Sequence, residues 1–139
     1  MAPTHDRMNR DELHYAALDN DAVRTAELIA EGADPSVTDD AGWTPLHFAA
    51  QENAFEAAEL LVEAGANVNA RNEYGNSPLG VGLARGTGDQ KLPLLTLLKE
   101  AGTDLHAQNT GGVSILDLLR NIVWNDATLA ELFKDELAE

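Results

Sequence analysis

The sequence predicts an all-α solenoid of about four helix-turn-helix repeats, joined by β-hairpin-like fingers and closed by N- and C-terminal capping repeats. Two recurring phrases support this fold class. The phrase Leu-His-Tyr-Ala-Ala at 13–17 returns 33 residues later as Leu-His-Phe-Ala-Ala at 46–50. The phrase Glu-Gly-Ala-Asp at 31–34 returns after 33 and then 37 residues, at 64–67 and 101–104. Such a period is the length of one supersecondary unit, so the chain is built of repeats.

The second unit shows most clearly how each repeat is built. Thr44 is placed to accept a hydrogen bond from the first helical turn, and Pro45 takes the first helical position, where no N–H is needed. Apolar residues then follow at helical spacing, which predicts a helix from Pro45 to about residue 53. A second predicted helix, 55–63, ends before Gly65, which supplies a left-handed residue. Helices of about two turns are marginal alone in water, so the units must stack on one another.

The first and last units are predicted to be caps. In the first unit Asp11 takes the capping position, and Arg24, Thr25 and Glu27 replace apolar residues, as expected for a terminal repeat with one side in water. The last unit starts at Ser114, where Asp117 completes a pattern that resembles a capping box. Its second helix is expected at about 127–137, with no Gly-Ala-Asp phrase after it. The prediction is a disordered N-terminal tail at 1–9 and a single domain at 10–139, with repeats at about 10–39, 40–72, 73–109 and 110–139.

Composition excludes several classes of partner. The 24 acidic and 9 basic residues give a formal net charge of −15. Because binding to phosphate backbones relies on clustered Lys and Arg, we expect neither nucleic acid nor an anionic membrane as a partner. The chain contains no cysteine, which excludes a thiolate nucleophile and a cysteine-ligated metal. No apolar run of about 18 residues occurs, and we expect a cytoplasmic protein.

The acidic residues leave two interpretations open. Much of the negative charge has the spacing of the wet side of a helix, at Glu27, Glu31, Glu56, Glu59 and Glu63. One interpretation is a solvated face that keeps the protein soluble, and the other is attraction to a basic partner.

The second unit resembles the ankyrin repeat through nearly its whole length. The resemblance rests on Thr44-Pro-Leu-His-Phe-Ala-Ala50 and on the phrase from Leu60 to Ala70, and it covers residues 10 to about 137 as four repeats. The third repeat departs by having Ser77-Pro-Leu-Gly80 and a four-residue insertion within 86–91. The fourth repeat lacks both the Pro and the His.

This resemblance implies a curved stack of antiparallel helix pairs with projecting fingers. It also implies a protein without catalytic activity that binds a protein partner through its concave face and finger tips. Carried over position by position, the partner-binding residues are Asp40, Ala41, Trp43, Gln51, Glu52, Glu73, Tyr74, Asn76, Ala84, Arg85, Thr110, Gly111 and Val113. We expect a monomer, with no catalytic residue, no metal site and no cofactor.

The aromatic residues divide into two groups. Trp43 and Tyr74 are expected on fingers, where such residues serve as binding hot spots. The alternative is that each covers the flank of an adjacent finger. Trp124, between the two helices of the last unit, is interpreted as a lid on the core.

Other chemistry-bearing residues are assigned to structure. His14 and His47 recur one period apart, and the resemblance implies that they hydrogen-bond within and between neighbouring turns. Asp19-Asn20-Asp21 and Asp39-Asp40 lack the twelve-residue loop of a calcium site and are assigned to turns and caps. The insertion at 86–91 lacks the Gly-Lys-Ser/Thr ending of a phosphate loop.

Two glycines distinguish the first helix of the third repeat. Gly80 and Gly82 each lower helix propensity by roughly 0.8 to 1 kcal/mol relative to Ala, so this repeat is predicted to be the least stable. Either they open a groove for a side chain of the partner, or they reflect sequence drift.

Three functions are consistent with these sequence features. The leading hypothesis is a non-catalytic protein-binding module. The alternative is an acidic inhibitor, such as an immunity or antitoxin-like protein that neutralises a basic target. A regulatory domain that is part of a larger enzyme or works beside one is the third, although the two predicted caps argue against it.

Overall fold

The computed structural model describes residues 8–84, 89–123 and 126–138, and within these ranges the fold is helical. The helices are α1 (Glu12–Leu18), α2 (Ala22–Ala30), α3 (Pro45–Gln51), α4 (Phe55–Glu63), α5 (Pro78–Ala84), the short 3-10 helix η1 (Asp89–Lys91), α6 (Leu92–Glu100), α7 (Ile115–Ile122), α8 (Ala127–Leu132) and α9 (Lys134–Leu137). The described residues form no strand, and their one isolated bridge joins Gln108 to Ser114.

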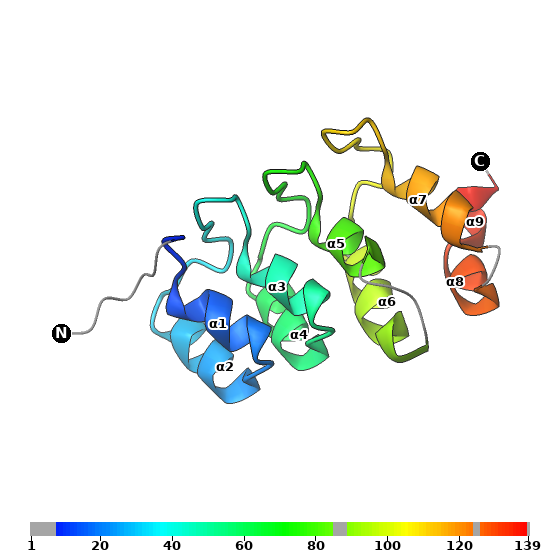
Figure 1. Ribbon diagram of the computed structural model, residues 1–139. Coiled ribbons are helices and arrows are strands. Elements are labelled where there is room, and N and C mark those ends of the chain that lie inside the picture. Colours follow the sequence, from blue (N-terminus) through cyan, green and yellow to red (C-terminus); the bar gives the residue numbers. More distant parts are fainter. Residues whose placement is uncertain (1–7, 85–88, 124–125, 139) are drawn as a thin grey trace.

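The helices form two rows (Figure 1). The inner row is α1, α3, α5 and α7, the outer row is α2, α4, α6 and α8, and long fingers project from the inner row on one side of the molecule. The predicted all-α repeat solenoid is therefore confirmed. The fingers connect successive helix pairs and are turns held by side chains.

Capping residues determine where the inner helices begin. Asp11, Thr44 and Ser114 are extended residues whose side chains accept hydrogen bonds from the N–H groups of Leu13, His47 and Asp117. These caps match the prediction, and the third helix begins at Pro45 as expected. It ends at Gln51, two residues early, because Asn53 adopts a left-handed conformation with a φ of 55°.

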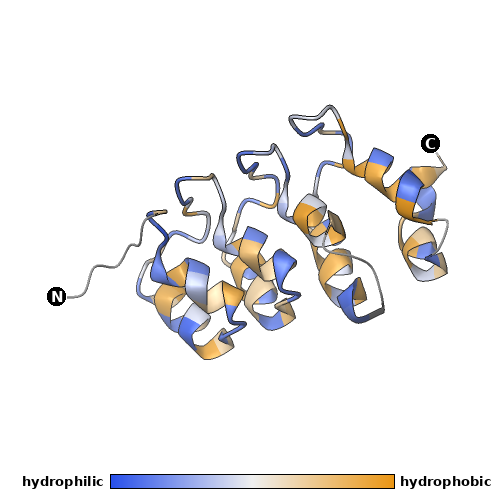
Figure 2. Cartoon of the chain, viewed as in Figure 1, coloured by the Kyte–Doolittle hydropathy of each residue, from blue (hydrophilic) through white to orange (hydrophobic). Residues whose placement is uncertain are grey.

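The core lies between the two rows. Small residues such as Ala17, Ala49 and Ala50 are completely buried on the inner helices, so that neighbouring backbones approach closely. Buried leucines fill the space behind them, among them Leu46 and Leu79. Figure 2 shows hydrophobic residues concentrated in the helices, whereas the fingers are mostly hydrophilic.

The N-terminal cap differs from its prediction at Thr25. We expected this residue on the wet side of the first repeat, yet it is completely buried. Its hydroxyl donates to the Asp21 carbonyl at 2.7 Å, so the polar group is satisfied inside the helix. Thr25 can therefore occupy the position one period before the buried Ala58.

The last repeat also differs from its prediction. The single helix expected at 127–137 is divided into α8 and α9 at Phe133, whose backbone has a φ of −109° and a ψ of 18°. The break brings the Phe133 side chain into the core, where it is fully buried. Trp124, interpreted as a lid, lies outside the described residues.

Ordered contacts begin before the predicted domain boundary at residue 10. The carbonyl of Met8 accepts a hydrogen bond from Asp40 N at 2.8 Å, and the Asn9 side chain donates to Asp40 Oδ1 at 2.8 Å. Residues 1–7 of the predicted tail lie outside the described residues.

We expect Gly82→Ala to stabilise the protein by about 1 kcal/mol, the difference in helix propensity between the two residues. Gly82 lies inside α5, and a Cβ there would meet Leu95 Cδ2 at 3.6 Å and Ala50 Cβ at 3.7 Å, which are ordinary contact distances. Urea unfolding measures the change. The control is Gly75→Ala, which we expect to be destabilising, because Gly75 has a φ of +75° and a Cβ would lie 3.0 Å from Asn109 Cα. Loss of stability in Gly82→Ala would show that the packing of α5 against Leu95 and Ala50 requires a glycine at this position.

Candidate functional site

In each finger one Asp or Asn side chain, at the same position of the repeat, holds the turn together. The Oδ1 atom of Asp39 accepts hydrogen bonds from Ala41 N and Trp43 N, both at 2.9 Å. Asn72 and Asn109 form the same pairs of bonds in the next two fingers, at 2.9 to 3.1 Å. Backbone donors two and four residues further along are thereby satisfied, so each tip is a rigid turn.

The finger tips are also joined to one another in register. Asp40 N donates to Met8 O at 2.8 Å, Glu73 N to Ala41 O at 2.8 Å, and Thr110 N to Tyr74 O at 2.9 Å. Met8 thus takes the place that Ala41 and Tyr74 take in later fingers. The tips form one continuous edge along the stack.

Two buried histidines connect the inner helices to the fingers. His14 Nε2 lies 2.8 Å from Trp43 O, and His47 Nε2 lies 2.8 Å from Asn76 O. In each ring Nδ1 accepts from the capping residue's N–H, which is Asp11 for His14 and Thr44 for His47. The ring must therefore donate from Nε2. The structural role expected for both histidines is confirmed.

Burial lowers the pKa of His47 to about 4, although its hydrogen bond to the Asn76 backbone acts in the opposite direction. The ring is neutral at physiological pH and carries its proton on Nε2. Because both ring nitrogens are hydrogen-bonded inside the protein, His47 is not free to bind a metal.

The two finger aromatics have different surroundings. The Trp43 ring is half-buried and lies 5.0 Å from the Phe48 ring and 5.6 Å from the His47 ring. Trp43 therefore covers the inner helix of its own repeat, which neither sequence interpretation foresaw. Tyr74 is 57% exposed at its finger tip.

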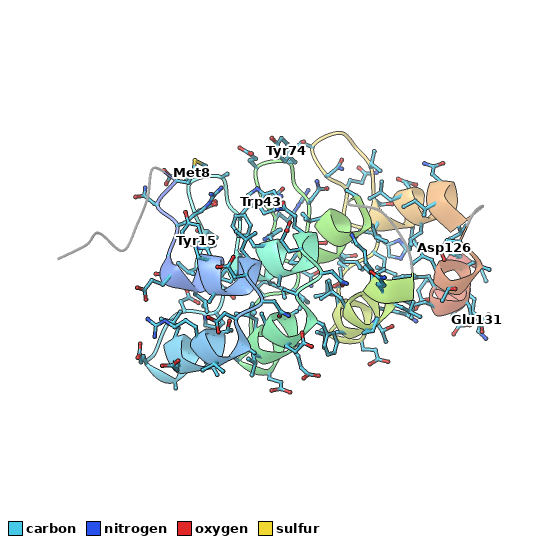
Figure 3. All side chains as sticks on the ribbon, turned by 60° about the horizontal axis from the view of Figure 1, so that its bottom comes forward. Met8, Tyr15, Trp43, Tyr74, Asp126 and Glu131 are labelled. Carbon is cyan, nitrogen blue, oxygen red and sulfur yellow. The ribbon has the colours of Figure 1, made fainter. Side chains whose placement is uncertain are left out.

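Tyr15, which was not among the predicted partner-binding residues, is 37% exposed on α1. It stands one period of 33 residues before Phe48, so alignment of the two units would have placed both on the same face of the inner helices. Figure 3 shows Met8, Tyr15, Trp43 and Tyr74 in the part of the molecule formed by the first three repeats, whereas Asp126 and Glu131 lie at the opposite end. We call the surface that bears Tyr15, Trp43 and Tyr74 the finger surface.

The other residues expected to contact a partner are distributed along the stack. The exposed ones are Asp40, Glu52, Glu73, Ala84, Thr110 and Gly111, and the half-buried ones are Ala41, Gln51, Asn76 and Val113. Arg85 lies outside the described residues. Asn76 is engaged within the protein, because its carbonyl bonds to His47 and its Oδ1 accepts from Asn109 Nδ2 at 3.1 Å.

A cavity of about 280 Å³ lies between the third and fourth repeats. Gly80, Ile115 and Leu118 contribute its apolar part, while Asn69 and Asp104 are among its polar residues. Of the two glycines singled out in the sequence, Gly80 lines this cavity, whereas Gly82 packs against Leu95 and Ala50. The cavity is large enough for a single side chain.

The described part of the chain contains no group of three His, Cys, Asp or Glu side chains that could hold a metal ion. Over the same residues no helix is long and apolar enough to cross a membrane. The Asp19–Asp21 and Asp39–Asp40 segments act as turns and caps, since Asp21 caps α2 and Asp39 organises its finger.

Stacked helix pairs with joined finger tips define the class of helical-repeat proteins that present an extended surface for binding. A family model for ankyrin repeats, in three copies, matches residues 13–109. This match covers more than two thirds of the chain, and the protein belongs to the ankyrin-repeat family. Members of this family are generally protein–protein interaction modules and typically non-catalytic. Comparison with curated proteins gives no significant match.

Proposed function

We propose that this protein is a non-catalytic binding module that holds a protein partner on its finger surface, the concave side implied by the family resemblance. The observation that carries the proposal is the exposed ring of Tyr74 on a finger tip, with Tyr15 and Trp43 on the same surface. Aromatic side chains of this kind provide large contact areas at little cost in side-chain entropy.

The rigidity of the finger tips supports this proposal. The turns are held by Asp39, Asn72 and Asn109, and the tips are joined by one backbone hydrogen bond at each junction. A surface that is ordered before binding loses little conformational entropy when the partner docks. The proposed state is a cytoplasmic monomer, and the net charge of −15 makes nucleic acid an unfavourable partner.

Tyr74→Ala is expected to weaken partner binding by roughly tenfold or more, as truncation of an interface hot spot does. The folded protein should be unaffected, because the side chain is 57% exposed. The partner is first isolated from the native cell with the wild-type chain and identified by mass spectrometry. Isothermal titration calorimetry of the purified pair then gives the dissociation constants.

Val23→Ala is the matched control, because Val23 is 72% exposed on the outer helix α2, away from the fingers. This variant should bind as the wild type does. Equal affinities for Tyr74→Ala and the wild type would exclude Tyr74 from the interface. Trp43→Ala is a poorer test, since its loss also exposes Phe48.

A further inference from the structure

A groove lies on the outer row of helices, on the side away from the fingers. It has a volume of about 490 Å³ and runs between α4 and α6. The residues that line it are Phe55, Glu59, Leu92, Pro93, Thr96, Leu97 and Glu100. Its floor is mainly apolar, and Phe55 and Leu97 are only partly buried against the core.

The two junctions between successive outer helices differ in how an asparagine side chain connects them. At the first junction Asn20 Oδ1 accepts from Ala57 N at 3.1 Å and Asn20 Nδ2 donates to Glu56 at 2.8 Å, which ties α4 to the preceding repeat. Asn53 takes the corresponding place one period later and has the same left-handed backbone. Its Nδ2 donates to Gln90 O at 3.1 Å, but its buried Oδ1 has no hydrogen-bond partner among the described residues. The α4–α6 junction therefore lacks the direct bond to the outer helix.

The edges of the groove are acidic. Glu59 on α4 and Glu100 on α6 are exposed, and Glu63 continues the row one turn further along α4. None of the three forms an ion pair within the ranges that the structure describes. The electrostatic potential at the groove is therefore negative, because no basic side chain of the described residues pairs with these carboxylates.

The two lysines nearest to the groove in sequence, Lys91 at the N-terminus of α6 and Lys99 within α6, make contacts elsewhere. Lys91 Nζ donates to Gly82 O on α5 at 3.0 Å. Lys99 Nζ lies 3.1 Å from Glu136 Oε1, and it donates to Leu132 O at 2.8 Å, toward the last repeat. Neither lysine lines the groove, so a bound cation would meet the carboxylates of Glu59 and Glu100 there.

We propose that the groove between α4 and α6 is a second docking surface, and that its occupant is a cationic amphipathic helix of a partner protein. The apolar floor fits the apolar stripe of such a helix, and Glu59 and Glu100 match Lys or Arg residues on its flanks. Both walls are nine-residue helices, about 13 Å long at 1.5 Å per residue, which accommodates two to three turns of the partner. This surface is separate from the finger surface, so two proteins can be held together.

The probe for this proposal is a fluorescent synthetic peptide of about 14 residues, with leucines at helical i, i+3/i+4 and i+7 spacing and lysines on the flanks. It is titrated against the full chain, and NMR chemical-shift changes locate the site. A scrambled peptide of the same composition separates the apolar stripe from simple charge attraction. The test variant is Glu59→Lys/Glu100→Lys, and the matched control is Glu27→Lys/Glu31→Lys, which makes the same charge change at exposed positions on and just after α2.

We expect shift changes confined to α4 and α6, binding at least about tenfold weaker for the test variant, and a change below about threefold for the control. Binding should also weaken at high salt, which screens exposed charges. The proposal is overturned if the wild type does not bind the peptide, or if it binds the scrambled peptide equally well. It is also overturned if both double variants lose affinity alike, or if the NMR chemical-shift changes map to the fingers. None of these outcomes bears on the effect of Tyr74→Ala, so the two proposals are tested separately.

Discussion

Phe133→Ala is expected to lower the free energy of unfolding by about 3 to 5 kcal/mol, the range for removing a fully buried aromatic ring from a core. The ring of Phe133 has no exposed surface, and Lys99 Nζ lies 5.6 Å from its centroid. It is the residue at which the chain turns from α8 into α9, so its loss leaves both short helices without their central contact. Urea denaturation followed by circular dichroism measures the change.

The effect of Phe133→Ala should appear first in the last repeat. In a solenoid each repeat contacts only its neighbours, so a damaged end repeat can unfold while the others stay folded. Hydrogen exchange should therefore accelerate in α7, α8 and α9 before α3 and α4. Leu137→Ala is the control, because Leu137 is only partly buried against the core and should cost less. A loss below about 1 kcal/mol for Phe133→Ala would contradict a core role for this ring.

Acidification is expected to remove about 3 kcal/mol of stability through His47 alone. Burial lowers its pKa in the folded protein from 6.5 to about 4, so the unfolded chain binds the proton more readily. The stabilisation from the neutral ring is fully present above about pH 6.5 and is lost as the pH falls toward 4. Below that pH the contribution of His47 to stability changes no further. The gap between the two pKa values corresponds to about 3 kcal/mol.

A comparison of variants isolates this contribution from the titration of the carboxylates. His47→Gln cannot take up the proton, so the stability difference between the wild type and this variant should shrink by about 3 kcal/mol from pH 7.5 to pH 4. Urea unfolding at a series of pH values supplies both curves. His106→Gln serves as the control for replacing a histidine elsewhere in the chain, because His106 is exposed. A difference that is independent of pH would mean that the folded and unfolded chains bind a proton at His47 equally well, which would contradict the lowered pKa.

The two buried histidines show how far a repeated motif can be interpreted from sequence. Their recurrence one period apart indicated a shared structural role, and the structure confirms it through bonds to Trp43 O and Asn76 O. The caps at Asp11, Thr44 and Ser114 were also predictable, since a cap involves residues two or three positions apart. The same holds for Gly65, which has a φ of 90° after α4.

The finger surface was only partly predictable. Tyr74 was selected from its position, but the pattern could not distinguish its 57% exposure from the half-buried state of Trp43, which depends on the ring of Phe48. Tyr15 was missed, although its alignment with Phe48 is present in the sequence. The burial of Thr25 was also missed, because its hydroxyl is satisfied by a carbonyl of its own helix.

By itself, the sequence determined the repeat period, the start of α3, both ends of α4 and the identity of the capping residues, because each depends on hydrogen bonds and apolar spacing within one short segment. Only the tertiary structure decided which aromatics remain exposed, where the last helix breaks and how the α4–α6 groove opens. The half-buried state of Trp43 depends on the Phe48 ring of its own repeat. The last two features depend on contacts between residues that lie about one repeat apart, such as Lys99 with Phe133 and Asn53 with Gln90. Such contacts form only when the repeats stack, so no local pattern can encode their geometry.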